Sequence, residues 1–142
     1  MDKQIKVGIG VMILREDSVL LGHRIGKDTG GIYEPGSWCL PGGKQEFGET
    51  FYEGAAREVE EETSLHISEM ELFGAADDIA SDRHFVTLWV VAGNCEGTAR
   101  VTEPDKQDAW KWFPLDALPE RIYGPSEKFI RAYLKKRACT IG

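Results

Sequence analysis

The 142-residue sequence predicts an α/β domain in which a mixed β-sheet lies between helices. Two observations lead to this fold class. Short apolar runs typical of strands stand on both sides of one strongly amphipathic helix, and a second amphipathic helix follows the last run. The length fits one domain, and the hydrophobic content of 42% is ordinary for a globular protein. We therefore expect a single domain over residues 1–142, with no internal repeat and no linker.

The first elements are two strands and a loop. Ile5–Leu14 is apolar and β-branched, so it is predicted to be a buried strand, and Gly8 and Gly10 within it indicate close approach of another backbone or of a ligand. Ser18–Arg24 is predicted to pair back onto it as a hairpin. The segment 25–37 holds four glycines and a proline and is expected to be a long loop, a kind of segment that is often functional.

A short strand, a glycine loop and the clearest helix come next. Trp38–Leu40 is predicted to be a strand, with Trp38 in the core, and it ends at Pro41-Gly42-Gly43, whose exposed N–H groups could approach phosphate oxygens. Thr50 with Glu53 three residues later forms a capping box. The helix should end near Ser64. Its apolar face has helical spacing and comprises Phe51, Tyr52, Ala55, Ala56 and Val59.

The second half of the chain is predicted as strands followed by a helix. Ile67–Ile79 and His84–Val91 are predicted to be strands, the latter strongly β-forming, and His84 is expected to be a strand residue without a metal role. Residues 93–107 are polar and are expected to form a loop. Ala109–Phe113 alternates in polarity like a half-buried strand, and Pro125–Arg137 has the spacing of an amphipathic helix.

Charge and cysteine content exclude several classes of protein. Asp and Glu number 24 against 17 Lys and Arg, which gives a net charge of −7 and makes a nucleic acid polymer an unsuitable partner. The three cysteines are odd in number and widely spaced, so we expect reduced thiols and a cytoplasmic location. The first residues lack the longer apolar stretch of a signal peptide, and no segment approaches about 20 apolar residues, so we expect no targeting segment and no membrane association.

The acidic residues are concentrated in one stretch. Seven glutamates lie between Glu46 and Glu62, where Arg57 is the only basic residue. On a helix the side chains of Glu58, Glu61 and Glu62 share a face, and like charges at that spacing destabilise it. Two interpretations remain open from spacing alone. The stretch is either a solvated acidic face with Glu53–Arg57 and Arg57–Glu61 pairs, or a site for a hard divalent cation such as Mg²⁺ or Mn²⁺.

The spacing of these residues resembles the Nudix box. Gly43, five residues, Glu49, seven residues and then Arg57-Glu58-Val59-Glu60-Glu61-Glu62-Thr63-Ser64-Leu65 match the family pattern over 43–65, except that Ser64 stands where the family has glycine. Glycine at a helix end relieves a left-handed backbone, so this departure affects the expected turn and not the carboxylates. The segments VGIGVMIL, VLLGHR, GSWCLPGGKQEFGE and WKWFPLDALP are also similar to small MutT-type Nudix proteins.

The resemblance implies a Nudix fold, an α/β/α sandwich around a mixed sheet, and hydrolysis that uses Mg²⁺ or Mn²⁺. By position, it implies Glu58 and Glu62 as principal metal ligands and Glu61 as a further ligand or the general base. Arg57 would pair with Glu49 and orient the helix, and the carbonyl of Gly43 would be a further ligand. The implied catalytic set is therefore Glu61, Glu58, Glu62, Arg57 and Glu49. Glu103, in the polar loop, is a weaker candidate for a late carboxylate.

The positions outside the box suggest a substrate pocket. Trp112 and Phe113 end a late strand, where an aromatic ring could stack on a base, although Trp110 and Trp112 could equally pack under the C-terminal helix. Arg24 could bind a phosphate or form a surface ion pair. The predicted substrate-binding residues are Arg24, His23, Gly42, Gly43, Trp112 and Phe113.

The leading functional prediction is a nucleoside triphosphate diphosphatase, acting on a small nucleotide that includes oxidised or modified forms. Some related ADP-ribose hydrolases have a proline about sixteen residues past the box, and many dinucleoside polyphosphate hydrolases have a tyrosine near there; this chain has Ser81 and Asp82. The alternatives are an ADP-ribose or nucleotide-sugar pyrophosphatase and a nucleotide-sensing module without turnover. The resemblance also suggests a homodimer.

Overall fold

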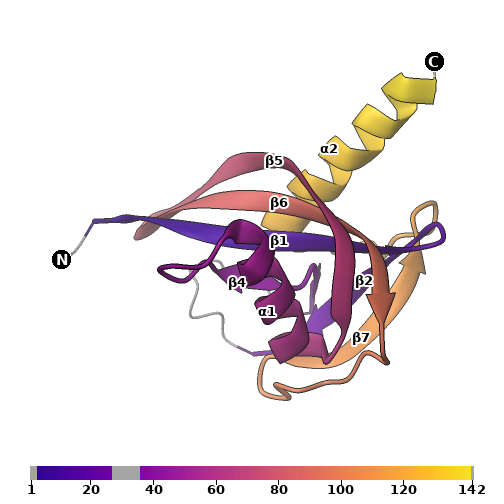
Figure 1. Cartoon of the computed structure of the whole chain (residues 1–142), viewed down its shortest axis with the longest axis horizontal. Helices are drawn as coiled ribbons and strands as arrows, with labels where there is room; N and C mark the ends of the chain where they lie inside the picture. Colours follow the sequence, from indigo (N-terminus) through magenta and orange to yellow (C-terminus); the bar gives the residue numbers. More distant parts are fainter. Residues whose placement is uncertain (1–2, 27–35, 142) are drawn as a thin grey trace.

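The structure, a computed structural model, describes residues 3–26 and 36–141, with side chains up to residue 138 (Figure 1). Most of the predicted loop 25–37 and the thiol of Cys139 therefore lie outside the described residues. The elements are β1 (Ile5–Arg15), β2 (Ser18–Arg24), β3 (Trp38–Cys39), β4 (Gly42–Lys44), α1 (Phe51–Thr63), β5 (His66–Ala80), β6 (Arg83–Glu96), β7 (Gln107–Pro114) and α2 (Gly124–Ile141).

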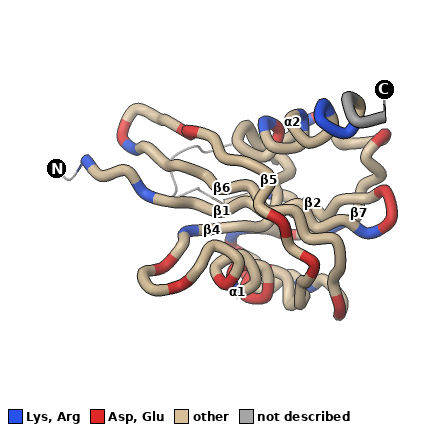
Figure 2. Tube along the Cα trace, turned by 45° about the horizontal axis from the view of Figure 1, so that its top comes forward, with Lys and Arg blue, Asp and Glu red and all other residues tan. Residues whose placement is uncertain are grey.

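The sheet is mixed, as predicted. Its strands run in the order β3-β2-β1-β6-β5, while β4 pairs with β1 and β7 with β2. Among the named strands of the described residues, β1 and β6 pair in parallel, which places Ile5 opposite His84 and Ile13 opposite Ala92, and the other strand pairs are antiparallel. Helices α1 and α2 lie on opposite sides of the sheet (Figure 2). The α/β/α sandwich that the resemblance implied is confirmed.

Alternation along β1 divides the core in two. Ile9, Val11 and Ile13 point to the α1 side and pack with Ala55 and Val59 of that helix. The side chain of Met12 points the other way, into a cluster with residues of α2 such as Phe129. In that second cluster the rings of Trp89 and Phe129 stack with centroids 5.1 Å apart. Each helix therefore covers its own apolar cluster on one face of the sheet.

Helix α1 begins and ends where its sequence predicts. The Thr50 hydroxyl accepts from the Glu53 N–H at 3.1 Å, and the Glu53 carboxylate accepts from the Thr50 N–H at 2.8 Å. This capping box satisfies two N–H groups of the first turn. The carboxylate of Glu53 is thus engaged at the cap and not with Arg57, as the solvated-face interpretation required. At the other end, Ser64 has φ +70° and ψ +6°, so a serine adopts the left-handed conformation that favours glycine.

Several predicted boundaries are corrected by pairings distant in sequence. Gly42 and Gly43 form strand β4 and not a flexible loop, because they pair with Gly10 and Ile9 of β1. Strand β6 continues to Glu96, so the polar loop is shorter than the predicted 93–107. Helix α2 is also longer than predicted. No described helix is long and apolar enough to cross a membrane.

Candidate active site

Arg57 occupies the centre of an ion-pair network on α1. Its Nε and one terminal nitrogen lie 3.0 and 2.7 Å from the two carboxylate oxygens of Glu49. The same terminal nitrogen donates to the carbonyl of Lys44 at 2.9 Å, and Nε lies 3.1 Å from Glu46. We call Arg57, Glu46, Glu49 and the Lys44 carbonyl the arginine clamp. It fastens the helix to β4 and to the loop between them.

The clamp fixes the charge of its members. Hydrogen bonds from the Arg57 guanidinium, with one from the Glu46 N–H, lower the pKa of Glu49 to about 2. The Glu49 hydrogen bond in turn raises the pKa of Arg57 well above its ordinary value. Arg57 also donates to Glu58 at 2.9 Å and to Glu61 at 3.3 Å. One permanent cation therefore orients two of the three glutamates that the resemblance placed in the metal site.

Glu62 lies in a different environment from Glu49. One carboxylate oxygen accepts the Gly42 N–H at 2.7 Å. Burial raises its pKa to about 8, and the nearby charges of Glu58 and Glu103 add to the rise against the lowering effect of that hydrogen bond and of Lys106. The N–H that we expected to face a phosphate is thus used by Glu62. A buried carboxylate of this kind binds a proton or a cation readily at neutral pH.

Glu58 and Glu103 complete a set that we call the carboxylate group: Glu58, Glu62 and Glu103. The Glu58 carboxylate lies directly over Gly43, where any Cβ would collide with it. Its pKa is raised by burial, with contributions from Glu61 and Glu103, against the lowering effect of Arg57. Glu103 accepts from Lys106 at 3.2 Å. Glycine at position 43 is therefore required for helix α1 to bring its carboxylates against β4.

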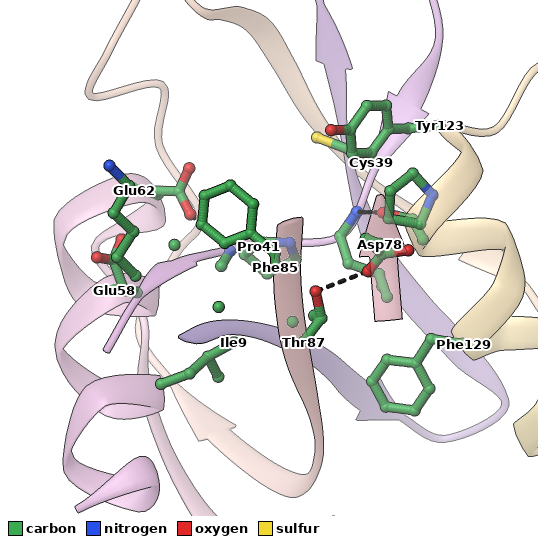
Figure 3. A pocket seen from close by; sticks show the side chains of 18 of the residues that line it. Ile9, Cys39, Pro41, Glu58, Glu62, Asp78, Phe85, Thr87, Tyr123 and Phe129 are labelled. Carbon is green, nitrogen blue, oxygen red and sulfur yellow. Dashed lines mark hydrogen bonds between the residues drawn. The ribbon is translucent and has the colours of Figure 1, made fainter. Parts of the chain in front are cut away.

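These side chains line one end of a cavity of about 740 Å³. Figure 3 shows Glu58 and Glu62 at one end and Asp78, Thr87, Tyr123 and Phe129 at the other, with Pro41 and Phe85 between them. The volume lies within the range of small-molecule sites, about 300–1,000 Å³. The cavity is therefore large enough for a nucleotide and has its acidic groups at one end.

Three of the predicted substrate-binding residues line this cavity. They are Arg24, Gly42 and Gly43. The Arg24 guanidinium lies over the ring of Tyr123 at 4.0 Å from its centroid, which keeps the arginine at the cavity wall.

The other three, His23, Trp112 and Phe113, are not among the described residues that line this cavity. His23 and Phe113 both pack against Trp38, each with ring centroids 4.8 Å apart. The guanidinium carbon of Arg15 lies 4.2 Å from the ring centroid of Trp112. Trp112 packs against the apolar cluster beneath α1. Trp110 also packs against that cluster, so the alternative of both tryptophans under the C-terminal helix is wrong. Alternation showed that the tryptophans share a face but not which helix covers it.

Sequence reasoning missed the residues at the far end of the cavity. Asp78 is the clearest of them, with only 10% of its side chain exposed. Its two oxygens accept from Thr87 at 2.6 Å and from Lys128 at 2.8 Å. The available signal in the sequence was an acidic residue, Asp78, inside a predicted strand. The cysteines lie as predicted where they are described: Cys39 and Cys95 are free, and burial raises the pKa of Cys39 to about 11.

The donor set fits a hard divalent cation, although it is not yet arranged around one. Among the described residues, no three His, Cys, Asp or Glu side chains converge as a ready ligand set. The oxygens of Glu62 and Glu58 are instead engaged by the Gly42 N–H and by Arg57. Buried carboxylates that repel one another favour Mg²⁺ or Mn²⁺, which prefer oxygen ligands. His84 lies apart, 2.7 Å from Asp77.

Comparison with known proteins identifies the family. The NUDIX domain matches residues 4–133. Human 8-oxo-dGDP phosphatase NUDT18 is 32% identical over 113 residues, which cover 80% of this chain but 33% of that protein. The MutT-like protein of Streptomyces ambofaciens is 32% identical over 116 residues, covering 82% of this chain and 68% of that one. The chain spans less than half the length of the human relative.

The solved structures agree with the sequence matches. The crystal structure of the MutT NUDIX hydrolase from Burkholderia pseudomallei aligns with a TM-score of 0.81 and 34% identity, covering 91% of this chain and 98% of that one. The match therefore extends over nine-tenths of the chain. The family match, the shared fold and the glutamates gathered on α1 lead to one conclusion: the chain belongs to the Nudix hydrolase family and is MutT-like.

Proposed function

We propose that this protein is a Mg²⁺-dependent nucleoside triphosphate diphosphatase, which releases a nucleoside monophosphate and pyrophosphate. The observation that supports this most directly is the carboxylate group, buried against glycine strand β4 at one end of a nucleotide-sized cavity. Carboxylates repel a polyphosphate unless cations lie between the two. The site thus combines a means of binding cations with room for the organic part of a nucleotide.

Each residue of the site has a proposed role. Glu58, Glu62 and the carbonyl of Gly43 would bind the metal, with Glu61 as a further ligand or the general base. Bound there, Mg²⁺ or Mn²⁺ neutralises charge on the phosphoryl oxygens and acidifies water. The arginine clamp positions Glu58 and Glu61 without contacting substrate. Arg24, which also lines the cavity, is proposed to bind a phosphate.

Glu61 differs from the other two glutamates in exposure. Its side chain is 59% exposed and lies 3.3 Å from Arg57. A general base must reach solvent to exchange its proton, which favours Glu61 for that role. We expect Glu61→Gln to lower kcat even at saturating Mg²⁺. A Glu61→Gln variant that recovers wild-type kcat at high Mg²⁺ would show a ligand and not a base.

A second candidate substrate is a nucleoside diphosphate. It is favoured by the name of the human relative, an 8-oxo-dGDP phosphatase. That protein is about three times longer than the matched region, so its activity is not transferred directly. The products distinguish the candidates, since a triphosphate split between its α and β phosphates yields pyrophosphate and a diphosphate yields inorganic phosphate.

The test is a substrate panel with separate detection of pyrophosphate and phosphate. The panel contains the ordinary nucleoside and deoxynucleoside triphosphates, 8-oxo-dGTP, dGDP, 8-oxo-dGDP, ADP-ribose and GDP-mannose, each with Mg²⁺ and with EDTA. Pyrophosphate from a triphosphate that EDTA abolishes supports the proposal. Product from ADP-ribose or GDP-mannose alone would assign the protein to the nucleotide-sugar class. No product from any compound would favour a nucleotide sensor.

Two further properties stay predictions. The homodimer is testable by size-exclusion chromatography with light scattering. The cytoplasmic location is testable by cell fractionation. Neither affects the chemistry proposed for the cavity, because every residue named there belongs to a single chain.

A further inference from the structure

Two glycines in the middle of β1, Gly8 and Gly10, are not required by the packing of the protein. A Cβ at Gly8 would meet its nearest neighbour, the Phe85 ring, at 3.5 Å. A Cβ at Gly10 would meet the Thr87 methyl at 3.9 Å, and both distances are ordinary van der Waals contacts. Neither glycine has a positive φ. At Gly42 and Gly43, by contrast, a Cβ would collide with neighbouring atoms.

Glycine inside a strand lowers the stability of the protein, and no packing contact requires glycine at these two positions. Relative to alanine, a strand glycine is destabilising because the unfolded chain is more flexible. On the same face of β1, the next residue, Met12, is fully buried under α2. Gly8 and Gly10 lie on this face too, and both line the cavity. Backbone without side chains therefore forms part of the cavity wall.

The groups beside this bare backbone favour a flat ring with polar edges. Phe85 supplies an aromatic wall, and Phe129 lies near the other glycine, with Cδ2 4.0 Å from the Cβ position of Gly10. Asp78 is fixed by its hydrogen bonds from Thr87 and Lys128, and its carboxylate can accept further N–H donors. Figure 3 shows Asp78 and Phe129 at the end of the cavity opposite Glu58 and Glu62, with Phe85 between the two ends.

We propose that Gly8 and Gly10 are specificity-determining residues, left without side chains so that the ring of a nucleobase lies against the backbone of β1. The inference rests on the proposed function, because it takes the ring to belong to the nucleotide whose phosphates face the carboxylate group. A Cβ at either position would occupy the space of the ring. It would therefore weaken binding while leaving the free protein at least as stable.

The control for this proposal is Gly93. It is also a strand glycine without a positive φ, and its Cβ would meet only ordinary contacts, the nearest being the Glu69 carbonyl oxygen at 3.6 Å. Gly93 does not line the cavity. Gly93→Ala thus makes the same chemical change as Gly8→Ala and Gly10→Ala in a place where no ring would lie.

The experiment compares melting temperatures of the metal-free protein with a nucleoside monophosphate and with ribose 5-phosphate, which has the same sugar phosphate but no base. We expect the monophosphate to raise Tm in the wild type and in Gly93→Ala, and ribose 5-phosphate to raise it much less. In Gly10→Val the ligand Kd should rise about tenfold or more, the change that 1.4 kcal/mol of lost binding produces. Gly8→Ala and Gly10→Ala should show smaller losses, with Tm of the free protein unchanged or higher.

Three outcomes would overturn the proposal: equal shifts with the two ligands, no shift with any monophosphate in the wild type, or unchanged monophosphate affinity in all three cavity variants. The measurement does not depend on turnover. A wild type that binds the monophosphate but hydrolyses nothing in the substrate panel would refute the proposed function and leave the base subsite standing. Hydrolysis in the substrate panel with unchanged monophosphate affinity in the Gly8 and Gly10 variants would refute the base subsite and leave the proposed function standing.

Discussion

Glu49 and Glu62 lie near opposite ends of the same acidic segment, but their electrostatic environments differ. Glu49 accepts three hydrogen bonds, two of them from Arg57, and its pKa falls to about 2. Glu62 accepts one backbone N–H, is buried near Glu58 and Glu103, and its pKa rises to about 8. One carboxylate has a permanent cation supplied by the protein, and the other does not.

This difference separates the residues that stabilise the fold from those that are left with an affinity for protons or cations. The arginine clamp is electrostatically complete, so it stabilises the fold and sets the angle of α1. The carboxylate group is electrostatically incomplete, and folding leaves it with an affinity for protons or cations. In the sequence, Glu46, Glu49, Glu58 and Glu62 belong to one acidic stretch, and Glu103 lies in a later loop. Arg57 donates two hydrogen bonds to Glu49 and one to Glu58, while Glu62 accepts from the Gly42 N–H.

The largest expected effect is a loss of activity when a member of the carboxylate group is changed. Glu62→Gln keeps the shape of the side chain and removes a charged ligand, so several kcal/mol of transition-state stabilisation should be lost, about three orders of magnitude in kcat. Steady-state kinetics at saturating Mg²⁺ measures it. Glu60→Gln, on the same helix but 58% exposed and outside the cavity, is the matched control and should keep wild-type kcat. Equal activity in the two variants would sink the metal-site proposal.

A change in the clamp should act on stability first. Arg57→Gln leaves Glu49 and Glu58, each with 15% side-chain exposure, without their cation. The free energy of unfolding should fall by about 1–3 kcal/mol, the usual result of leaving a part-buried polar group unsatisfied. Urea unfolding monitored by circular dichroism measures it. The control Arg131→Gln removes an arginine that is 78% exposed, and its effect should be near zero. A loss as small as the control's would show that the clamp is dispensable.

The pH dependence of stability should distinguish the two carboxylates in metal-free protein. The pKa of Glu62 is raised from 4.5 to about 8, so its stabilising contribution is present below pH 4.5 and is lost as pH rises through 8. The slope is at most about 1.4 kcal/mol per pH unit. The pKa of Glu49 is lowered from 4.5 to about 2, so its contribution is present above pH 4.5 and is lost as pH falls through 2.

Urea unfolding at a series of pH values, in wild type and Glu62→Gln, measures these slopes. The variant should lose the decline between pH 4.5 and 8 and keep the acid-side behaviour due to Glu49. Added Mg²⁺ should flatten the same decline in the wild type only. An identical decline in both proteins would mean that Glu62 does not cause it.

The smallest expected effect concerns the end of the helix. Ser64 adopts φ +70°, which costs a non-glycine residue about 1 kcal/mol. Ser64→Gly should therefore raise stability by roughly 0.5 kcal/mol once the greater flexibility of the unfolded glycine is subtracted. The reciprocal control is Gly48→Ala, at φ +88° with nothing within 4 Å of the new Cβ, which should lower stability. Calorimetry checks both. Stabilisation by both substitutions would contradict the backbone explanation.

Local signals predicted the fold well where the determinants are local. The capping box at Thr50 and Glu53 fixed the start of α1, and strand β2 has the predicted bounds. Strand β4 was missed because three residues, two of them glycine, have no strand propensity of their own. They become a strand only because Gly8–Gly10 of β1 lie beside them, and that pairing is not encoded near residue 42.

The site could also be predicted only where its residues are close together in the sequence. Arg57, Glu58, Glu61 and Glu62 belong to one helix, so their spacing placed them together. Trp112 and Phe113 do not line the cavity, because alternation gives the shared face of a strand but not its cover. Asp78 and Lys106 come from segments joined to the site only through the sheet. Their positions needed the three-dimensional pairing of β5 with β6 and of β7 with β2.

The parallel pairing of β1 with β6 also bears on how the protein folds. It joins Ile5 to His84 and Ile13 to Ala92, so it closes a loop of most of the chain and is expected to form slowly. Helix α1 can form from local signals, but the wall opposite its glutamates exists only after this closure. A cation bound in the cavity would therefore recognise the finished fold and not a folding intermediate. It would slow unfolding and leave the folding rate nearly unchanged.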